Sequence, residues 1–160
     1  MACTQGPNFQ ELSEVEKQAI ADFCLLWSLF EARCLNEKGN VAAIAQAVKK
    51  LKPRLVPHAV VDASLAYFQK RYIDEQGFNY RFTQLYFRPG DRQLDVEAVL
   101  LGRTLDNSSV LTALLIIVYR FRNNLFHGPK WRYALSEQLE NFRTANGLLM
   151  LTMDLHSLED

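Results

Sequence analysis

One segment of the sequence, from Val110 to Leu125, predicts a helix that is apolar on nearly every side. Its apolar residues include Val110, Leu111, Leu114, Leu115, Ile117, Val118, Phe121 and Leu125. A helix on a protein surface carries a narrower apolar stripe, so a helix of this kind belongs in the middle of a bundle. Its longest apolar run, Val110 to Val118 with Thr112 inside it, is far shorter than the roughly 20 residues that cross a bilayer. We therefore expect an all-α bundle around this helix, with no membrane span.

Two helices are predicted before this segment from capping residues and apolar spacing. Ser13 and Glu16 form a capping box, which marks the start of a long helix that ends near Asn36. An apolar stripe with a period of about 3.6 residues runs along this helix and is rich in aromatic residues. Asn40 suits the N-cap of a second, shorter helix, which Pro53 stops.

Further helices are predicted between Pro57 and the central segment. Pro57 suits the first turn of a third helix, whose apolar stripe ends at Tyr72. Residues 78–92 are ambiguous between a short helix and an aromatic-rich loop, and residues 95–105 indicate another short helix.

The central helix has predicted boundaries at both ends. Asn107 and Ser108 are capping residues at its start, and Gly128-Pro129 ends it. The last helix runs from about Trp131 into the C-terminal residues. Because the chain shows no internal repeat and no linker, residues 1–160 are expected to form one helical domain, an up-and-down core with additional short helices.

Composition narrows the class of protein. The chain has 160 residues, of which 49% are hydrophobic, and its formal net charge is zero, which excludes a wholly basic protein that coats nucleic acid. Its three cysteines, Cys3, Cys24 and Cys34, have no paired spacing that would indicate a disulfide framework. The first residues lack the pattern of a signal peptide, so we expect a cytoplasmic protein.

Charge is nevertheless uneven along the chain. No acidic residue occurs between Asp106 and Glu137. This window contains four basic residues besides a histidine: Arg120, Arg122, Lys130 and Arg132. A basic flank on a neutral protein suits a localised anionic ligand or self-association, although solvated helix faces are the simpler interpretation of any single cluster.

The end of the central helix combines a fixed cation, amides and an imidazole. On a helix, a spacing of four residues puts Tyr119, Asn123 and His127 in one row, and Arg122 lies beside that row. An arginine binds phosphate oxygens, a histidine exchanges a proton near neutral pH, and an asparagine can orient either group. Together these side chains suit cleavage of RNA through its own 2′-hydroxyl without a metal.

Two other interpretations remain open. Basic residues in a last helical turn, followed by Gly128-Pro129, are an ordinary stop signal, which would make the segment purely structural. Alternatively, the same arginine and histidine bind an RNA, a nucleotide or a partner protein without cutting it.

The pattern Arg122-Asn123-x-x-x-His127 resembles the signature of the HEPN superfamily, the higher eukaryote and prokaryote nucleotide-binding domains. In that superfamily an arginine, a polar residue and a histidine stand at the end of one helix of an α-bundle. The longer string from Arg122 to Gly128 and the order of the predicted helices are also similar. The resemblance implies a HEPN-like fold and a metal-independent endoribonuclease in which Arg122 and His127 are catalytic and Asn123 assists.

The resemblance also implies partners. These are RNA, a second copy of the chain in a homodimer whose two motifs share one cleft, and an antitoxin protein in a toxin–antitoxin or antiphage defence setting. The chain departs from some toxins at Pro129, where a tyrosine often occurs. Some members of the superfamily do not cut, so the alternative function is a noncatalytic HEPN-like module that binds RNA, a nucleotide or a protein.

Further residues are candidates for supporting roles. Four residues near the motif are expected to contact the RNA: Tyr119, Asn124, Lys130 and Arg132. Glu31, on the first helix, is expected to face Arg122 or His127 and to orient them. Because no spacing of His, Cys or carboxylate residues indicates a metal site and no glycine-rich phosphate loop occurs, we expect no cofactor.

Overall fold

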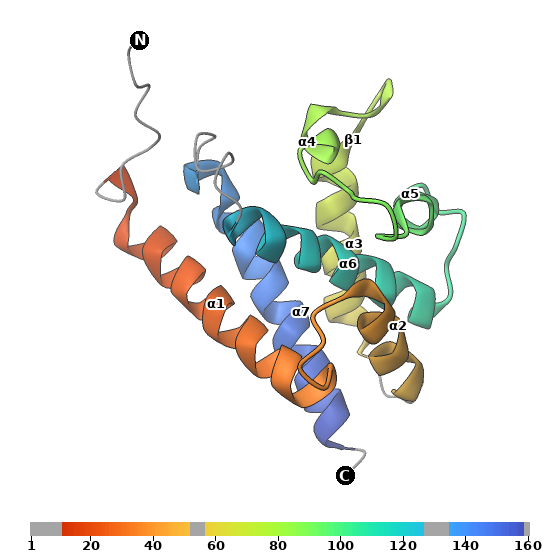
Figure 1. Cartoon of the computed structure of the whole chain (residues 1–160). Helices are drawn as coiled ribbons and strands as arrows, with labels where there is room; N and C mark the ends of the chain where they lie inside the picture. Colours follow the sequence, from red (N-terminus) through yellow and green to blue (C-terminus); the bar gives the residue numbers. More distant parts are fainter. Residues whose placement is uncertain (1–10, 52–56, 127–134, 159–160) are drawn as a thin grey trace.

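Figure 1 shows the computed structural model of the chain, which describes residues 11–51, 57–126 and 135–158. The longer helices are α1 (Glu14–Cys34), α3 (His58–Tyr72), α6 (Asn107–Phe126) and α7 (Leu139–Ser157). The shorter elements are α2 (Val41–Lys50), β1 (Ile73–Asp74), β2 (Gly77–Phe78), α4 (Tyr80–Thr83), α5 (Gln93–Leu100) and the 3₁₀ helix η4 (Leu135–Gln138). The described chain is mostly helical, which confirms the predicted all-α class.

α6 is the central helix of the fold. Residues 110–118 are all buried, and α6 contacts α2, α3, α5 and α7. Because each buried Val, Leu or Ile side chain contributes about 1.5–3 kcal/mol, this helix supplies a large share of the core. The prediction of a helix buried on nearly every side is therefore confirmed.

The start of α6 differs from the prediction. Asp106, and not Asn107 or Ser108, is the capping residue, because its Oδ2 accepts a hydrogen bond of 3.0 Å from the backbone N–H of Ser109. Asn107 and Ser108 are already the first residues of the helix. A carboxylate at this position also interacts favourably with the positive end of the helix dipole.

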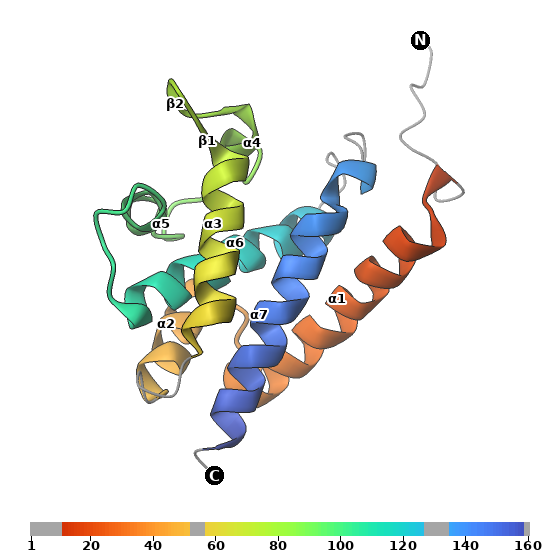
Figure 2. The same cartoon turned by 180° about the vertical axis from the view of Figure 1, so that it is seen from behind.

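α1 and α7 lie side by side and run in the same direction, as both Figure 1 and Figure 2 show. The rings of Phe23 and Phe142 lie 5.2 Å apart between them, and Asn146 donates to the carbonyl oxygen of Ala19 at 3.3 Å. α3 runs in the opposite direction along α7 (Figure 2), where the Tyr67 hydroxyl donates to Asn141 Oδ1 at 2.7 Å. These contacts hold the outer helices around α6.

The first two helices start where the sequence predicts. Ser13 and Glu16 form both hydrogen bonds of the capping box at the start of α1. Asn40 caps α2 by accepting from the backbone N–H of Ala43 at 2.8 Å. These two caps are confirmed because a helix cap depends on residues within one turn of each other. Pro57 was predicted in the first turn of the third helix, but it stands just before α3, at its N-cap position.

The sequence left residues 78–92 open between a short helix and an aromatic-rich loop. The segment after α3 contains both, and a small β-hairpin as well. β1 and β2 pair antiparallel, and the short helix α4 follows them. The rings of Phe78 and Phe82 stack at 4.2 Å between centroids, and Phe87 packs on Phe82.

The helix predicted over 95–105 is α5, which ends at Leu100. The last helix, predicted from about Trp131, begins at Leu139 after η4, while residues 131–134 lie outside the described residues.

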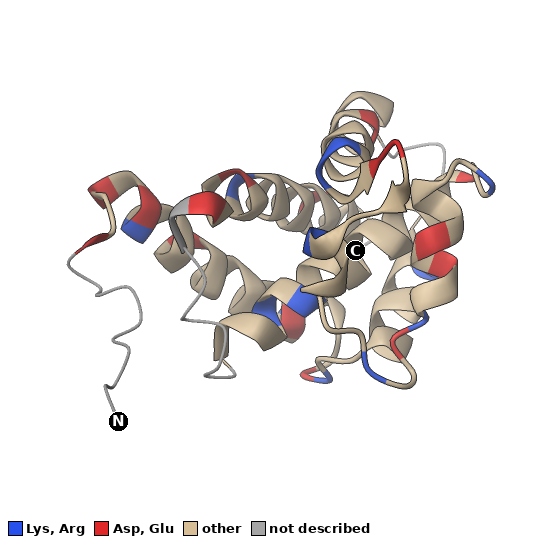
Figure 3. Cartoon of the chain, turned by 90° about the horizontal axis from the view of Figure 1, so that it is seen from above, with Lys and Arg blue, Asp and Glu red and all other residues tan. Residues whose placement is uncertain are grey.

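Charged residues are spread over several helices of the described chain (Figure 3). Acidic positions gather at the start of α1, beside the N-terminal trace, where Glu11, Glu14 and Glu16 follow one another. Within the described ranges, no helix combines the length and the apolar character needed to cross a membrane.

Candidate functional site

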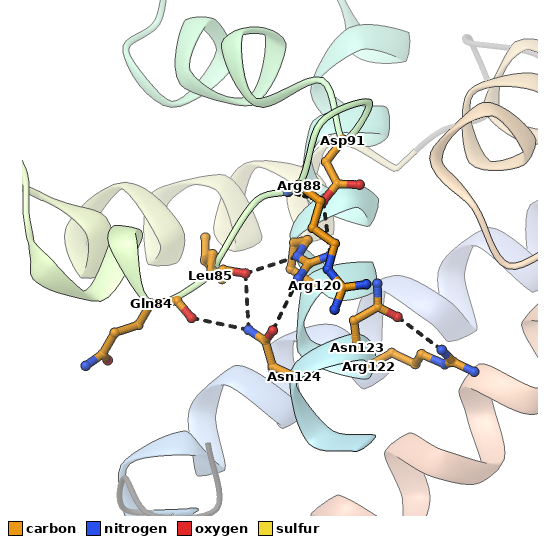
Figure 4. A network of polar contacts seen from close by, with 8 residues as sticks. All are labelled: Gln84, Leu85, Arg88, Asp91, Arg120, Arg122, Asn123 and Asn124. Atoms are coloured by element: carbon orange, nitrogen blue, oxygen red, sulfur yellow. Dashed lines mark hydrogen bonds and ion pairs between the residues drawn. The ribbon is translucent and has the colours of Figure 1, made fainter. Parts of the chain in front are cut away.

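The C-terminal half of α6 carries a polar network that begins at Arg120 (Figure 4). This side chain is only 1% exposed. Its Nη1 lies 3.0 Å from Asp91 Oδ2, and its Nε donates to the carbonyl oxygen of Leu85 at 3.0 Å. Burial lowers the pKa of Arg120, and the nearby Asp91 carboxylate opposes that shift. Arg120 therefore fastens the segment after α4 to the central helix.

Asn124 belongs to the same network. Its Nδ2 donates to the carbonyl oxygens of Gln84 at 3.3 Å and of Leu85 at 3.2 Å, and its Oδ1 accepts from Arg120 Nη2 at 3.4 Å. The sequence predicts that Asn124 contacts RNA. The structure places its amide between α6 and the segment after α4, where it holds the two together.

Arg122 and Asn123 lie on the other side of α6, away from Gln84 (Figure 4). Asn123 is 5% exposed, and its Oδ1 accepts a hydrogen bond of 3.0 Å from Arg122 Nη1. The guanidinium carbon of Arg122 lies 5.4 Å from the ring centroid of Phe126, which is 58% exposed. The structure thus brings together two of the three predicted catalytic residues.

The charge of Arg122 is not neutralised within the described residues. Its side chain is half-buried and forms no ion pair with a described acidic residue. Its Nε is buried and has no hydrogen-bond partner, and Asn123 is its hydrogen-bond partner at Nη1. A planar cation with donors of this kind matches the oxygens of a phosphate group.

Tyr119 and Glu31 are connected through Trp27. The ring of Tyr119 lies 6.1 Å from the ring of Trp27, on α1, and Trp27 Nε1 donates to Glu31 Oε2 at 2.8 Å. Tyr119 is half-buried, and the side of α6 that bears it faces α1. Glu31 was expected to face Arg122 or His127. Its described hydrogen bond is to Trp27, and that of Arg122 is to Asn123.

Three of the predicted site residues lie outside the described residues: His127, Lys130 and Arg132. Gly128-Pro129, the predicted end of the central helix, lies outside them as well, and Phe126 is the last described residue of α6. Among the described residues, no group of three or more His, Cys, Asp or Glu side chains is arranged to hold a metal ion.

Sequence reasoning missed the buried pair of Arg120 and Asp91. In the sequence, Arg120 is one of the basic residues of the acid-free window, and Asp91 lies in the ambiguous segment 78–92. An arginine among the apolar residues of a buried helix was the available signal, because a buried charge requires a partner.

The arrangement provides a half-buried arginine with unused donors, oriented by a buried asparagine, in the last turns of the central helix. Such a pair can bind one phosphate oxygen and stabilise negative charge on it. In comparisons with known proteins, the chain matches no family model, no curated protein and no solved structure.

Proposed function

We propose that the protein is a metal-independent endoribonuclease of the HEPN type. The observation that carries the proposal is the sequence pattern Arg122-Asn123-x-x-x-His127, of which Arg122 and Asn123 lie in the last turns of a buried central helix. The surroundings of Arg122 support the proposal. Its charge has no acidic partner within the described residues, and its Nη1 donates a hydrogen bond to Asn123. An arginine that served only to stop a helix has no need of a buried amide to orient it.

The reaction that these groups suit is attack by the 2′-hydroxyl of RNA on the adjacent phosphorus. His127 takes the proton of that hydroxyl as the new O–P bond forms. The bond from phosphorus to the 5′-oxygen breaks, and the departing oxygen takes up a proton. Arg122 stabilises the negative charge of the phosphorane-like transition state, and Asn123 holds Arg122 in place. The products are a 2′,3′-cyclic phosphate and a 5′-hydroxyl, so the proposed reaction requires no oxidant and no metal.

The proposed setting follows from the same resemblance. The protein acts in the cytoplasm as a homodimer with a composite active site, in a toxin–antitoxin or antiphage defence system, and an antitoxin protein restrains it. RNA contacts from Tyr119, Lys130 and Arg132 complete the proposed site.

Incubation of the purified protein with total RNA, in the presence of a chelator, tests the proposal. Wild-type protein is expected to produce fragments that end in 2′,3′-cyclic phosphate, His127→Ala to produce none, and Arg122→Ala to cut about 100- to 1000-fold more slowly. Arg33→Ala, which removes an exposed arginine of α1, is the matched control and should cut like wild type. Equal cleavage by wild type and His127→Ala would contradict the proposal.

A different outcome distinguishes the noncatalytic alternative. A protein that binds RNA, shows no product, and loses affinity on Arg122→Ala and in rising salt is a binding module and not a nuclease.

A further inference from the structure

A second pair of arginines, Arg71 at the end of α3 and Arg81 in α4, is held together by one asparagine. Asn79 Nδ2 donates to the carbonyl oxygen of Arg71 at 2.8 Å. Asn79 Oδ1 accepts from the backbone N–H of Arg81 at 3.0 Å. The backbones of the two arginines are thereby fixed on either side of a single amide group.

Neither arginine has an acidic partner in the described part of the chain. No described carboxylate lies within ion-pair distance of Arg71 or Arg81, and the Nε of each is buried without a described hydrogen-bond partner. Glu140, which acts on Tyr67, forms an ion pair with Arg143 at 2.7 Å. Two half-buried charges of the same sign, on backbone segments joined through one asparagine, repel each other, and an anionic ligand bound by both reduces that repulsion.

The charges of the two arginines act on the same pair of tyrosines. Burial raises the pKa of Tyr67, and the charges of Arg71 and Arg81 both oppose that shift. The same two charges oppose the effect of burial on the pKa of Tyr72. Both arginines therefore contribute positive charge to this part of the protein.

Tyr80 adds an aromatic surface beside this cluster. Its side chain is 63% exposed, and the guanidinium carbon of Arg81 lies 5.4 Å from its ring centroid. An exposed ring next to arginines is the combination with which proteins bind a base and its phosphate in single-stranded nucleic acid.

The cluster lies close to the end of α6. Gln84 and Leu85 directly follow α4, and their carbonyl oxygens accept hydrogen bonds from Asn124. Figure 4 shows Gln84 on one side of α6 and Arg122 on the other. Because Arg81 lies in α4, directly before Gln84, the α4 side of the central helix carries one arginine cluster and the opposite side carries Arg122.

We propose that Arg71 and Arg81 form a second contact for the substrate RNA, in which they bind one backbone phosphate while the ring of Tyr80 stacks on a neighbouring base. The identity of the ligand as RNA rests on the function proposed above. The site itself rests on two arginines that have no acidic partner among the described residues, and on the asparagine that joins their backbones.

Binding of a labelled single-stranded 2′-O-methyl RNA tests this inference, because the probe lacks the hydroxyl needed for cleavage. The affinity is measured over a range of salt concentrations. Arg71→Gln/Arg81→Gln is expected to bind more weakly, and the slope of log affinity against log salt to become shallower by about 0.7, the value for one phosphate on a single strand. Tyr80→Ala is expected to weaken binding by about fivefold or more without changing the slope.

Two controls keep the result interpretable. Arg71→Lys/Arg81→Lys retains the charges and should retain most of the slope, and Arg103→Gln, at an exposed arginine after α5, should bind like wild type. All variants should unfold at the wild-type temperature.

The inference is overturned if the glutamine variant keeps the wild-type affinity and slope, or if the wild-type protein does not bind the probe. Its failure differs from that of the proposed function, which fails when unmodified RNA remains uncut. A protein that binds the probe through Arg71 and Arg81 but cuts nothing supports the second contact and refutes the nuclease.

Discussion

Arg120 and Arg122 lie two residues apart on the same helix, yet their surroundings are opposite. The guanidinium of Arg120 is buried and bonded to Asp91, Leu85 and Asn124. The guanidinium of Arg122 is half-buried and bonded to Asn123, with an Nε that has no partner. The first arginine stabilises the fold, and the second retains its capacity to bind an anion.

The difference shows how one helix can combine stability with function. The face of α6 that bears Arg120 is closed by the segment after α4, so its polar groups are satisfied within the protein. The face that bears Arg122 leaves donors unused, and unused donors at a helix end are typical of binding sites. Four predictions test whether this division of roles is correct.

The largest effect is expected for Arg120→Ala. The substitution leaves Asp91 buried without its partner, so the free energy of unfolding should fall by about 3–5 kcal/mol. Arg120→Ala/Asp91→Ala should lose less than the sum of the two single variants, because no buried charge then remains unpaired. Urea titrations measure both values. A loss below about 1 kcal/mol for Arg120→Ala would remove the distinction between the two arginines.

Arg122→Ala is expected to affect activity and not stability. RNA cleavage should fall by about 100- to 1000-fold, the usual cost of removing one group that stabilises an oxyanion. The free energy of unfolding should change by less than about 1 kcal/mol, because the guanidinium is only half-buried and forms no ion pair with any residue that the structure describes. Cleavage rates and thermal unfolding of the same preparation measure the two effects. A large loss of stability with unchanged cleavage would show that Arg122, like Arg120, has a structural role.

Asn124→Ala tests whether Asn124 stabilises the fold, as Arg120 does, or serves a ligand, as is proposed for Arg122. Its hydrogen bonds to Gln84, Leu85 and Arg120 predict a loss of about 1–2 kcal/mol in the free energy of unfolding. RNA affinity should be unaltered at temperatures where the variant is folded. Weaker RNA binding with full stability would instead support the role predicted from the sequence.

The smallest effect is expected at the other end of α6, where Asp106→Ala removes the cap and touches neither arginine. The loss should be about 1 kcal/mol near neutral pH. Hydrogen bonds from Ser109 lower the pKa of Asp106, so its contribution is present above the carboxyl's unfolded pKa of about 3.9 and is lost as pH falls through the folded value. Wild type and variant should therefore converge in stability in acid, as unfolding curves at several pH values can measure. A constant difference would show that the carboxylate does not act as a charged cap.

The features that the sequence predicts correctly depend on residues close together in the chain. The capping box of Ser13 and Glu16 spans one turn, and so does the cap that Asn40 provides. The buried state of residues 110–118 follows from composition alone, because a segment that is apolar on nearly every side has no polar face to turn to water. Even here, Asp106 rather than its two neighbours caps α6, since several adjacent residues had suitable side chains.

The features that the sequence leaves open depend on contacts between distant segments. Arg120 and Asp91 are 29 residues apart, and Asn124 bonds carbonyl groups 39 and 40 residues away. No pattern of residue types in the sequence predicts contacts between residues so far apart along the chain. For the same reason the sequence does not show that Asn124, which is predicted to contact RNA, also forms hydrogen bonds within the fold.

The contact between Trp27 and Tyr119 gives the protein a built-in optical reporter. Trp27 is 4% exposed, and its ring adjoins Tyr119 while its N–H is bonded to Glu31. The chain has two tryptophans, so Trp131→Phe leaves Trp27 as the single source of tryptophan emission. Any ligand that shifts Tyr119 alters the polarity around that indole. Fluorescence can thus follow occupancy of the end of α6 in real time, without a label on either molecule.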